Sequence, residues 1–377
     1  MRFIGKLENL CIYDMGERED QCQDFSFRAG KSEGYGEFTF VYGPSAGGLT
    51  ESVQFMIKTS GEQILEIEAN PYFKKRKLKF SGRIEDVILT VERINAMFSA
   101  SHSLSFIIAV ERSVDVNVDY EVMMARIVEL ELERIRNHLH VLHKLAETGA
   151  LGVASYQLQE MEERTNRLIG EVCGHRYFFS SNWINSVKCN LEKVRLDYLN
   201  GFNSFFNDML ENRILIDRFQ NNGKIDQDWL IGPAARASGR SYDSRYDSDS
   251  LPYKDLGFSP IVERSPDTFG RFLIRGLEIL QSIEIIRGAL GKAKNVRGGE
   301  VKVKGVGSGM SRVESPSGDL VYKVKIDDGF ISTSFLPPSK ANLSFFLKSV
   351  IGTIFTDFPF NWEGFGIWIS EIGVEKE

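Results

Sequence analysis

The sequence has few cysteines and no long apolar run, and each shortage excludes a class of protein. None of the four cysteines has a partner at the C-x-x-C spacing that zinc sites and redox pairs use. We therefore expect buried or unused thiols at Cys11, Cys22, Cys173 and Cys189. The longest apolar run, around 106–110, is far shorter than the roughly 20 residues of a membrane-spanning helix. Membrane association would need partner subunits.

Positive charge is also in short supply, because 46 Lys and Arg face 52 Asp and Glu, for a formal net charge of −6. A protein that coats nucleic acid normally needs clustered excess positive charge, so we expect no nucleic-acid partner. Residues 1–6 contain two basic residues, Arg2 and Lys6, before any apolar stretch, and no apolar core of a signal peptide follows them. The expected compartment is therefore the cytoplasm.

The chain does contain enough apolar sequence for a large core, since 42% of its 377 residues are hydrophobic. The segments 38–42 and 53–68 read as strands on either side of the turn-forming residues 43–48. This pattern predicts a small antiparallel sheet. Later, the alternation over 320–326 and the turn at 327–329 predict a β-hairpin.

From about residue 119 the period becomes helical. Apolar residues recur at spacings of three and four over 128–146, 191–209 and 269–280, and the third stripe follows a Ser-Pro-Asp start signal at 265–267. Each stripe must be buried against another helix, which favours a bundle. A last helix is expected at about 342–355. The predicted class is α+β, with a central helical bundle, a small N-terminal antiparallel β-sheet and a C-terminal β-hairpin.

We divide the chain into four parts. Residues 1–40 are an N-terminal extension, 41–118 a β-rich region, 119–294 the helical bundle, and 295–377 the hairpin with the C-terminal region. There are no repeats and no low-complexity linker, so the bundle and its β attachments are expected to form one body.

Three short motifs of known binding and catalytic sites are incomplete in this sequence. Gly30-Lys31-Ser32 ends like a P-loop, but Phe25 stands where that motif needs glycine. The glycines of 305–309 lack the G-x-G-x-x-G spacing and lead into a hairpin instead of a helix. No H-E-x-x-H accompanies the histidines at 138, 140 and 143, so we expect ordinary surface or capped histidines there.

Four separated stretches resemble the motifs of one family. ERINAMF at 92–98, with SHS at 101–103 and AVE at 109–111, is similar to E-R-[VI]-C-G-I-C…H-S…A-V-E. ELERIRNHL at 131–139 is similar to E-[LV]-E-R-[IL]-x-x-H-L, and GHRY follows at 174–177. The most specific match is GPAARASG at 232–239 with DSRYD at 243–247 and PY at 252–253, which resembles G-x-x-x-R-A-S-G…D-x-R…P-Y.

The fourth stretch combines ESPSGDL at 314–320, PPS at 337–339, NL at 342–343 and DFP at 357–359. These resemble E-[AS]-P-R-G-E-L, R-P-P-S-F-x-N-L and the A-D-x-P that precedes a terminal D-P-C-x-x-C. The chain thus resembles the large subunit of nickel-iron hydrogenases, especially the membrane-bound energy-converting ones, and the quinone-site subunit of respiratory complex I. A hydrogenase large-subunit-like fold is implied, over roughly residues 40 to 375.

The resemblance implies where metal ligands would lie. In the hydrogenases four cysteines hold nickel and iron, and thiolates are the soft ligands that suit those metals. The matching positions here are Asn95, Phe98, Trp368 and Glu371. We therefore expect no nickel-iron centre, no metal and no cofactor bound by this chain, and no hydrogenase activity by itself.

The complex I branch lost the same cysteines and binds a quinone with a histidine from a G-P-x-H-P…H-G loop and a tyrosine near the first cysteine motif. The corresponding loop here, 43–48, has no histidine, and the tyrosine position falls near Ala96. The chain departs from both branches.

The implied function is that of a peripheral-arm large subunit in a membrane-bound, ion-translocating oxidoreductase complex, on the inner face of the cell membrane. Its partners would be an iron-sulfur small subunit carrying a cluster, complex I-type peripheral subunits and membrane ion-pumping subunits. NAD binding, quinone binding and electron transport are properties implied for complexes of this kind, and the acceptor here is unidentified, with a quinone-like molecule as one candidate. The alternative is a non-catalytic scaffold or coupling subunit with a plugged former site.

Three residues are candidates for catalysis. Glu92 and Arg93 could relay protons or tune the pocket, and a structural ion pair is the competing interpretation. His102 could donate a hydrogen bond into the cavity, or it could be a satisfied core histidine. Trp368 and Glu371 either line a new pocket or fill the abandoned one. A further set of charges is expected to fix a loop: Arg236, Asp243, Arg245 and Asp247.

Overall fold

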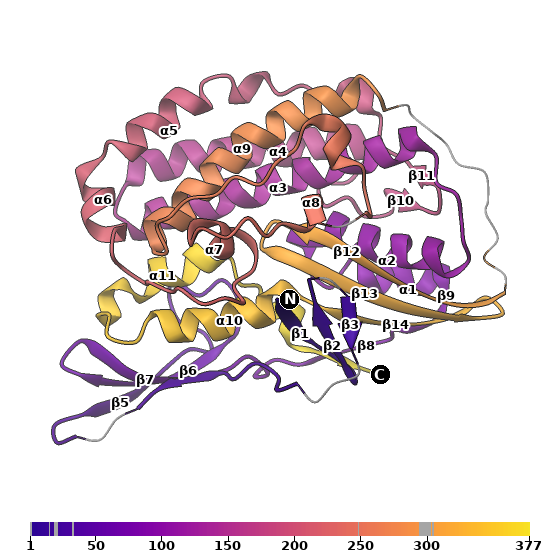
Figure 1. Ribbon diagram of the computed structural model, residues 1–377. Coiled ribbons are helices and arrows are strands. Elements are labelled where there is room, and N and C mark those ends of the chain that lie inside the picture. Colours follow the sequence, from indigo (N-terminus) through magenta and orange to yellow (C-terminus); the bar gives the residue numbers. More distant parts are fainter. Residues whose placement is uncertain are drawn as a thin grey trace.

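Long helices form one layer of the molecule, and small sheets with shorter helices pack beneath them (Figure 1). The computed structural model describes residues 2–14, 16–18, 22–31, 34–247, 249–293, 303 and 305–377. The first and last strands lie close together in this view. The predicted α+β class is confirmed.

The helical layer is built on α3 (Tyr120–Thr148), which packs against both α4 (Gly152–Cys173) and α9 (Thr268–Leu290). The buried stripe predicted for α3 is confirmed. For α9 the helix is confirmed, but the stripe Phe269, Leu273, Leu277 and Leu280 is only partly buried, and the fully buried face carries Phe272 and Ile279 instead. Asp267 starts α9, because its side chain accepts a hydrogen bond from the Gly270 amide at 3.0 Å. Shorter helices complete the layer: α5 (Phe202–Leu210), α6 (Arg213–Phe219), α7 (Gly232–Ala237), α8 (Ser244–Asp247) and the 3-10 turn η4 (Tyr253–Leu256).

The helix predicted over 191–209 is wrong in its first half. Two 3-10 turns, η2 (Leu191–Lys193) and η3 (Asp197–Leu199), precede α5, which begins only after Gly201. Separate turns still bury Leu191 and Val194 against the helical core. Spacings of three and four were therefore satisfied without a continuous helix.

The N-terminal region contains the expected antiparallel sheet. Its order is β4-β7-β6-β5, and on β6 Phe55 and Ile57 are buried whereas Met56 is exposed. A second small sheet, β1-β2-β3, precedes it in the chain. The strands are β1 (Phe3–Leu7), β2 (Leu10–Tyr13), β3 (Gly16–Arg18), β4 (Arg28–Gly30), β5 (Phe38–Tyr42), β6 (Gln54–Ser60) and β7 (Gln63–Asn70).

The predicted hairpin is confirmed as β13 (Gly318–Asp327) and β14 (Phe330–Leu336), in a sheet of order β12-β13-β14-β9. The other strands are β12 (Val306–Ser315) and β9 (Ser81–Arg83). Glycine is required on β12 because a Cβ on Gly309 would lie 2.1 Å from the carbonyl oxygen of Ala109, on helix α2 (Ser99–Ser113). The glycine-rich segment thus serves close packing of sheet on helix.

The remaining elements connect these layers. They are α1 (Ile84–Val91), the 3-10 turn η1 (Ala96–Phe98), β10 (Asn182–Trp183), β11 (Ser186–Val187), α10 (Pro338–Ser349), the 3-10 turn η5 (Phe355–Asp357), α11 (Phe358–Phe365), α12 (Ile369–Ile372) and the parallel pair β8 (Arg76–Leu78) and β15 (Val374–Lys376). The last helix, expected over 342–355, instead begins at Pro338. Proline is favoured in the first turn of a helix because the N–H that it lacks would have no hydrogen-bond partner within the helix there.

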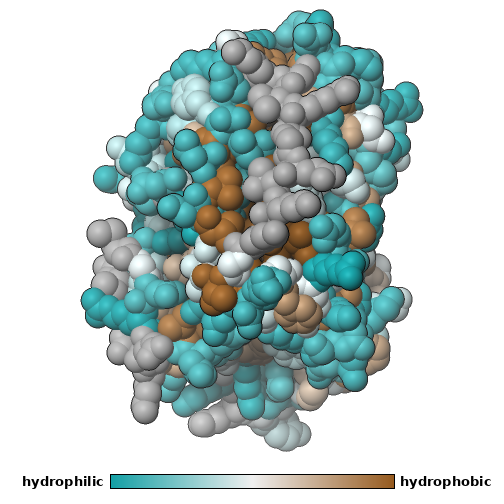
Figure 2. All heavy atoms as spheres, turned by 90° about the vertical axis from the view of Figure 1, so that its right-hand side faces the viewer, coloured by the Kyte–Doolittle hydropathy of each residue, from teal (hydrophilic) through white to brown (hydrophobic). Residues whose placement is uncertain are grey.

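No helix among the described residues is long and apolar enough to cross a membrane. The end of the molecule that carries α2 and the edges of the β12–β14 sheet presents a largely hydrophilic surface, with apolar side chains gathered near its middle (Figure 2).

The cysteines correct our expectation of unused thiols. Cys11 pairs with Cys22, and Cys173 pairs with Cys189, in two disulfides. The separations of 11 and 16 residues match no short motif, so only the fold brings these pairs together.

Candidate functional site

The structure brings together the four positions that match lost cysteine ligands. Asn95 precedes η1 and accepts a hydrogen bond from the Met97 amide at 3.0 Å, and its Nδ2 donates to Glu371 Oε1 at 3.4 Å. The rings of Phe98 and Trp368 meet edge to face, with centroids 5.9 Å apart. All four former ligand positions are buried.

Two further charged side chains hold the segments around residues 95 and 370. Arg76 Nη2 donates to the carbonyl oxygens of Ile94, at 2.6 Å, and Ser370, at 2.7 Å. Glu51 accepts a hydrogen bond from the Ser370 amide at 2.9 Å. Burial raises the pKa of Glu51, although these bonds oppose the shift. Neither residue was predicted from the sequence, because each lies outside the motifs.

A hydrogen-bonded chain runs through the site. His102 Nδ1 lies 2.7 Å from the Tyr322 hydroxyl oxygen, and His102 Nε2 lies 3.2 Å from Glu371 Oε1. Burial raises the pKa of Tyr322 well above its ordinary value, so its hydroxyl keeps its proton and donates to Nδ1. The imidazole proton is then assigned to Nε2 and points to Glu371.

Glu371 is the centre of this chain. Ser339 donates its hydroxyl proton to Oε2 of Glu371, and the Ser339 oxygen accepts from the Trp368 amide at 3.0 Å. Together with Asn95 and His102, three side-chain donors converge on one buried carboxylate. Ser339 belongs to the PPS motif, so its part in the site was open to sequence analysis; Tyr322 carried no such signal.

The start of helix α2 is fixed by a buried carboxylate. Glu133 on α3 accepts hydrogen bonds from the amides of Ala100 and Ser101 at 2.7 and 2.9 Å. A carboxylate at a helix N-terminus compensates the unpaired amides there. This contact positions His102 on the first turns of α2.

Glu92 and Arg93 contact residues other than those around the Glu371 carboxylate. Glu92 pairs with Arg93 and accepts from the Ser180 amide at 2.8 Å. The Arg93 guanidinium also stacks on Phe179, 4.6 Å from the ring centroid. Among the described residues, these contacts tie the pair to the segment after α4, which favours a structural ion pair over a relay.

The loop-fixing network expected around Arg236 is present and larger than expected. Arg236 contacts Glu278 at 2.6 Å, Glu314 at 2.8 Å and Asp243 at 3.0 Å. Arg245 contacts Asp243 at 2.7 Å, and Asp247 accepts from the Asp243 amide. The buried ion network is defined here as Glu131, Arg134, Arg236, Asp243, Arg245, Glu278 and Glu314.

Burial and pairing set the protonation of this network. Burial alone would raise the pKa of Glu278, but Arg236, His138 and Arg245 outweigh it and hold that pKa well below the usual range. Burial raises the pKa of Glu314 to about 7, with Asp243 adding to the shift and Arg236 opposing it.

The histidine expectation is corrected for His138, which is fully buried and lies within 2.7 Å of Glu278. Burial lowers its pKa to about 3, so the ring is neutral and donates from Nε2. His140 faces Glu162 at 3.1 Å and stacks near Trp368, with ring centroids 5.7 Å apart. His143 is bonded to Ser155 at 2.8 Å. The three rings thus have separate hydrogen-bond partners, although the His140 and His143 rings also meet edge to face, with centroids 6.3 Å apart.

The donors at the former ligand positions do not fit a nickel-iron centre. They offer one amide, one carboxylate and two aromatic rings in place of four thiolates, and soft metals need the thiolates. The carboxylate is already the acceptor for three donors. Trp368 Nε1 is the one polar atom of this set without a partner among the described residues.

Comparison with known proteins agrees with this fold. The sequence-family model of the 49 kDa subunit of respiratory-chain NADH dehydrogenase matches residues 147–308 of this chain. The membrane-bound hydrogenase subunit alpha of Pyrococcus furiosus is 25% identical over 84% of this chain and 82% of its own. An NADH-quinone oxidoreductase subunit of Dehalococcoides mccartyi is 27% identical over 84% of this chain and 92% of its own.

A solved structure is similar over most of the chain. It is a chain of the membrane-bound sulfane sulfur reductase, an archaeal respiratory membrane complex, with a TM-score of 0.81 and 22% identity over 89% of this chain and 98% of that one. The chain is therefore similar to membrane-bound hydrogenase subunits and to 49 kDa complex I subunits, and it lacks cysteines at the positions that match the hydrogenase ligands.

Proposed function

We propose that this chain is the peripheral large subunit of a membrane-bound oxidoreductase complex that moves ions. In that complex it would lie next to an iron-sulfur small subunit, on the inner face of the membrane, and would help deliver electrons and protons to an acceptor other than the proton. Support comes from relatives that are subunits of membrane hydrogenases and NADH-quinone oxidoreductases.

The observation that carries the proposal is the convergence of His102, Glu371 and Tyr322 at the former ligand positions. The two-electron reduction of a quinone or a polysulfide also consumes protons. A carboxylate hydrogen-bonded to an imidazole is a suitable proton donor and acceptor pair, since either group can hold the transferred proton. In this role Glu371 and His102 would supply protons, and Trp368 Nε1 would donate to an oxygen or sulfur of the acceptor.

The second candidate is a scaffold with a filled site. It is favoured by the direct contacts of Asn95 with Glu371 and of Phe98 with Trp368, which place bulky side chains against each other where the metal would lie. Such a subunit would transmit conformational change between partner subunits and reduce nothing itself.

The test uses the intact complex, isolated from native membranes through an affinity tag on this chain. Partner subunits are identified by mass spectrometry, nickel by elemental analysis, and iron-sulfur clusters by electron paramagnetic resonance. With reduced viologen as donor, the complex is assayed for reduction of a soluble quinone, polysulfide, NAD⁺ and protons. We expect no hydrogen evolution, no stoichiometric nickel, and reduction of one of the other acceptors.

The Glu371→Gln variant separates the two candidates. Gln keeps the size of the side chain but cannot hold the proton, so a relay predicts at least about a hundredfold loss of turnover with assembly intact. Glu171→Gln, on the exposed face of α4, is the matched control. Unchanged turnover in Glu371→Gln would favour the scaffold, and nickel at one atom per chain would contradict both.

A further inference from the structure

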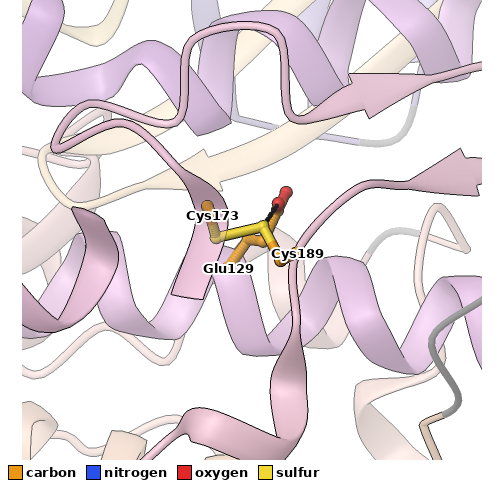
Figure 3. Close-up of side chains that lie close together, drawn as sticks. All are labelled: Glu129, Cys173 and Cys189. Atoms are coloured by element: carbon orange, nitrogen blue, oxygen red, sulfur yellow. Dashed lines mark hydrogen bonds between the residues drawn. A yellow bond between two sulfur atoms is a disulfide. The ribbon is translucent and has the colours of Figure 1, made fainter. Parts of the chain in front are cut away.

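A buried carboxyl group lies against one of the two disulfides. Cys173 ends α4, Cys189 follows β11, and Oε1 of Glu129, from α3, lies 2.7 Å from the Cys189 sulfur (Figure 3). Glu129 is fully buried, and its Oε2 accepts no hydrogen bond from any residue that the structure describes. A buried polar atom left without a partner is costly, so this position needs an explanation.

The groups that face Glu129 leave its charge poorly compensated. Arg126 and Glu133 flank it on α3, and Asn182 of β10 faces it. Arg126 already pairs with Glu111 through both terminal nitrogens, at 2.8 and 2.6 Å. Burial raises the pKa of Glu129 to about 8, with Asn182 and Arg126 opposing the shift and Glu133 adding to it. At neutral pH the carboxyl group therefore carries a proton beside the Cys189 sulfur.

We propose that Cys173–Cys189 is a redox-active disulfide, opened by a dithiol reductant, and that Glu129 protonates the departing Cys189 sulfur. The reductant thiolate attacks Cys173, which is partly exposed, whereas Cys189 is buried. The disulfide bond breaks, its electron pair stays on Cys189, and the proton of Glu129 moves to that sulfur. The reductant is then joined to Cys173 in a mixed disulfide.

The second thiolate of the reductant displaces Cys173 from that mixed disulfide. The reductant leaves as an intramolecular disulfide, and Cys173 and Glu129 each take a proton from solvent. The chain has then gained two electrons and two protons, and the reductant has lost them. Glu129 acts as the general acid because a protonated thiol is a better leaving group than a buried thiolate without a counter-charge.

The redox state would reach the candidate site through the loop that the disulfide closes, residues 174–188. Arg136 connects the two, since its Nη1 donates to the Arg176 carbonyl at 2.9 Å and its Nη2 to the Met97 carbonyl at 2.7 Å. Asn182 also donates to Ser103 at 3.1 Å. Reduction removes the covalent closure of the loop, so residues 96–103 lose part of their support. This inference does not depend on the proposed electron acceptor.

The rate of reduction tests the chemical step. The folded full-length chain is treated with dithiothreitol at pH values below and above 8, quenched with N-ethylmaleimide, and the Cys173 and Cys189 peptides are quantified by mass spectrometry. We expect the wild type to react at least about tenfold faster than Glu129→Gln near neutral pH. This ratio should fall toward one as the pH rises through about 8, because the wild-type carboxyl group then loses its proton.

The Cys11–Cys22 disulfide is the internal control, since its rate in the same samples should not respond to Glu129→Gln. A rate ratio that is constant with pH would assign Glu129 a structural role and overturn the proposal. So would a Cys173–Cys189 bond that dithiothreitol reduces only after the chain unfolds.

Hydrogen exchange tests the coupling. In the reduced chain, and in a variant with both Cys173→Ser and Cys189→Ser, we expect amides of 96–103 and 174–188 to exchange about tenfold faster than in the oxidised chain, with α9 unchanged. Equal exchange in the oxidised and reduced forms would overturn the coupling.

Discussion

The buried ion network and the former metal site differ in what they retain of the family motifs. The network is built from motif residues such as Arg236 and Glu314, and each of its charges contacts charges of opposite sign. At the positions that match the hydrogenase ligands, which we call the former metal site, the sequence has Asn95, Phe98 and Trp368 in place of cysteine. Replacing one charged residue of the network leaves its buried partner of opposite charge unpaired. Metal-ligating residues, in contrast, can be replaced together by side chains that pack against each other. The two regions therefore differ in how strongly the neighbouring side chains fix each residue.

Arg236→Ala should give the largest effect on stability. The substitution leaves Glu278, Asp243 and Glu314 without a shared cation in a buried position. We expect a loss of about 4 kcal/mol in the free energy of unfolding, measured by denaturant titration. Arg240→Ala is the control, because Arg240 pairs with the exposed Asp226 and should cost less than about 1 kcal/mol. Equal losses would mean that the network does not depend on mutual compensation.

Phe98→Ala should cost about 3 kcal/mol if this ring fills the former metal site, because a large buried side chain leaves a cavity behind. Phe73→Ala, at a surface position that is 53% exposed, provides the comparison. Thermal unfolding of both variants would measure the difference. A cost below about 1 kcal/mol for Phe98→Ala would instead indicate that the ring lines an open pocket.

Glu363→Gln should change the pH dependence of stability. Glu363 interacts with His140 beside the former metal site and with Arg275, and burial raises its pKa to about 7. The folded state therefore holds the proton that the unfolded state releases from about pH 4.5 upward, so stability falls between about pH 4.5 and 7 and is constant above.

The substitution removes this loss. We expect Glu363→Gln to gain about 3 kcal/mol relative to the wild type at pH 8, and nothing at pH 4. Denaturant titrations across this range would check the slope, and Glu171→Gln should leave it unchanged. If the wild-type free energy of unfolding instead rises between about pH 4.5 and 7, other titrating groups dominate the pH dependence of stability.

Asn95→Ala should give the smallest effect, about 1 kcal/mol, because the loss of a side-chain acceptor at the start of a helical turn costs about that much. Asn95→Ser retains an acceptor for the Met97 amide but cannot reach Glu371, so it should recover most of the stability. If Asn95→Ser is as unstable as Asn95→Ala, the contact with Glu371 matters more than the cap.

The helices and the hairpin were predictable because their signals are local. The stripe of α3, the Ser-Pro-Asp start of α9 and the Asp-Asp-Gly turn after β13 each depend on neighbouring residues. The helix over 191–209 failed because apolar spacing does not distinguish a helix from consecutive turns that bury the same side chains. Of the candidate site, the motifs predicted Asn95, Phe98, His102, Trp368 and Glu371, but they gave no sign of Tyr322, Arg76 or Glu51.

The sequence by itself determined the family resemblance and the loss of the four thiolates, because both are matters of residue type and order along the chain. Only the tertiary structure decided what lies at the positions that match the metal ligands: the Glu371 carboxylate, which accepts hydrogen bonds from Asn95, His102 and Ser339 in three separate segments. It also decided the state of the cysteines. Pairings such as Cys173 with Cys189, and their contact with Glu129, depend on where α3, α4 and the following loop pack, which no local pattern records.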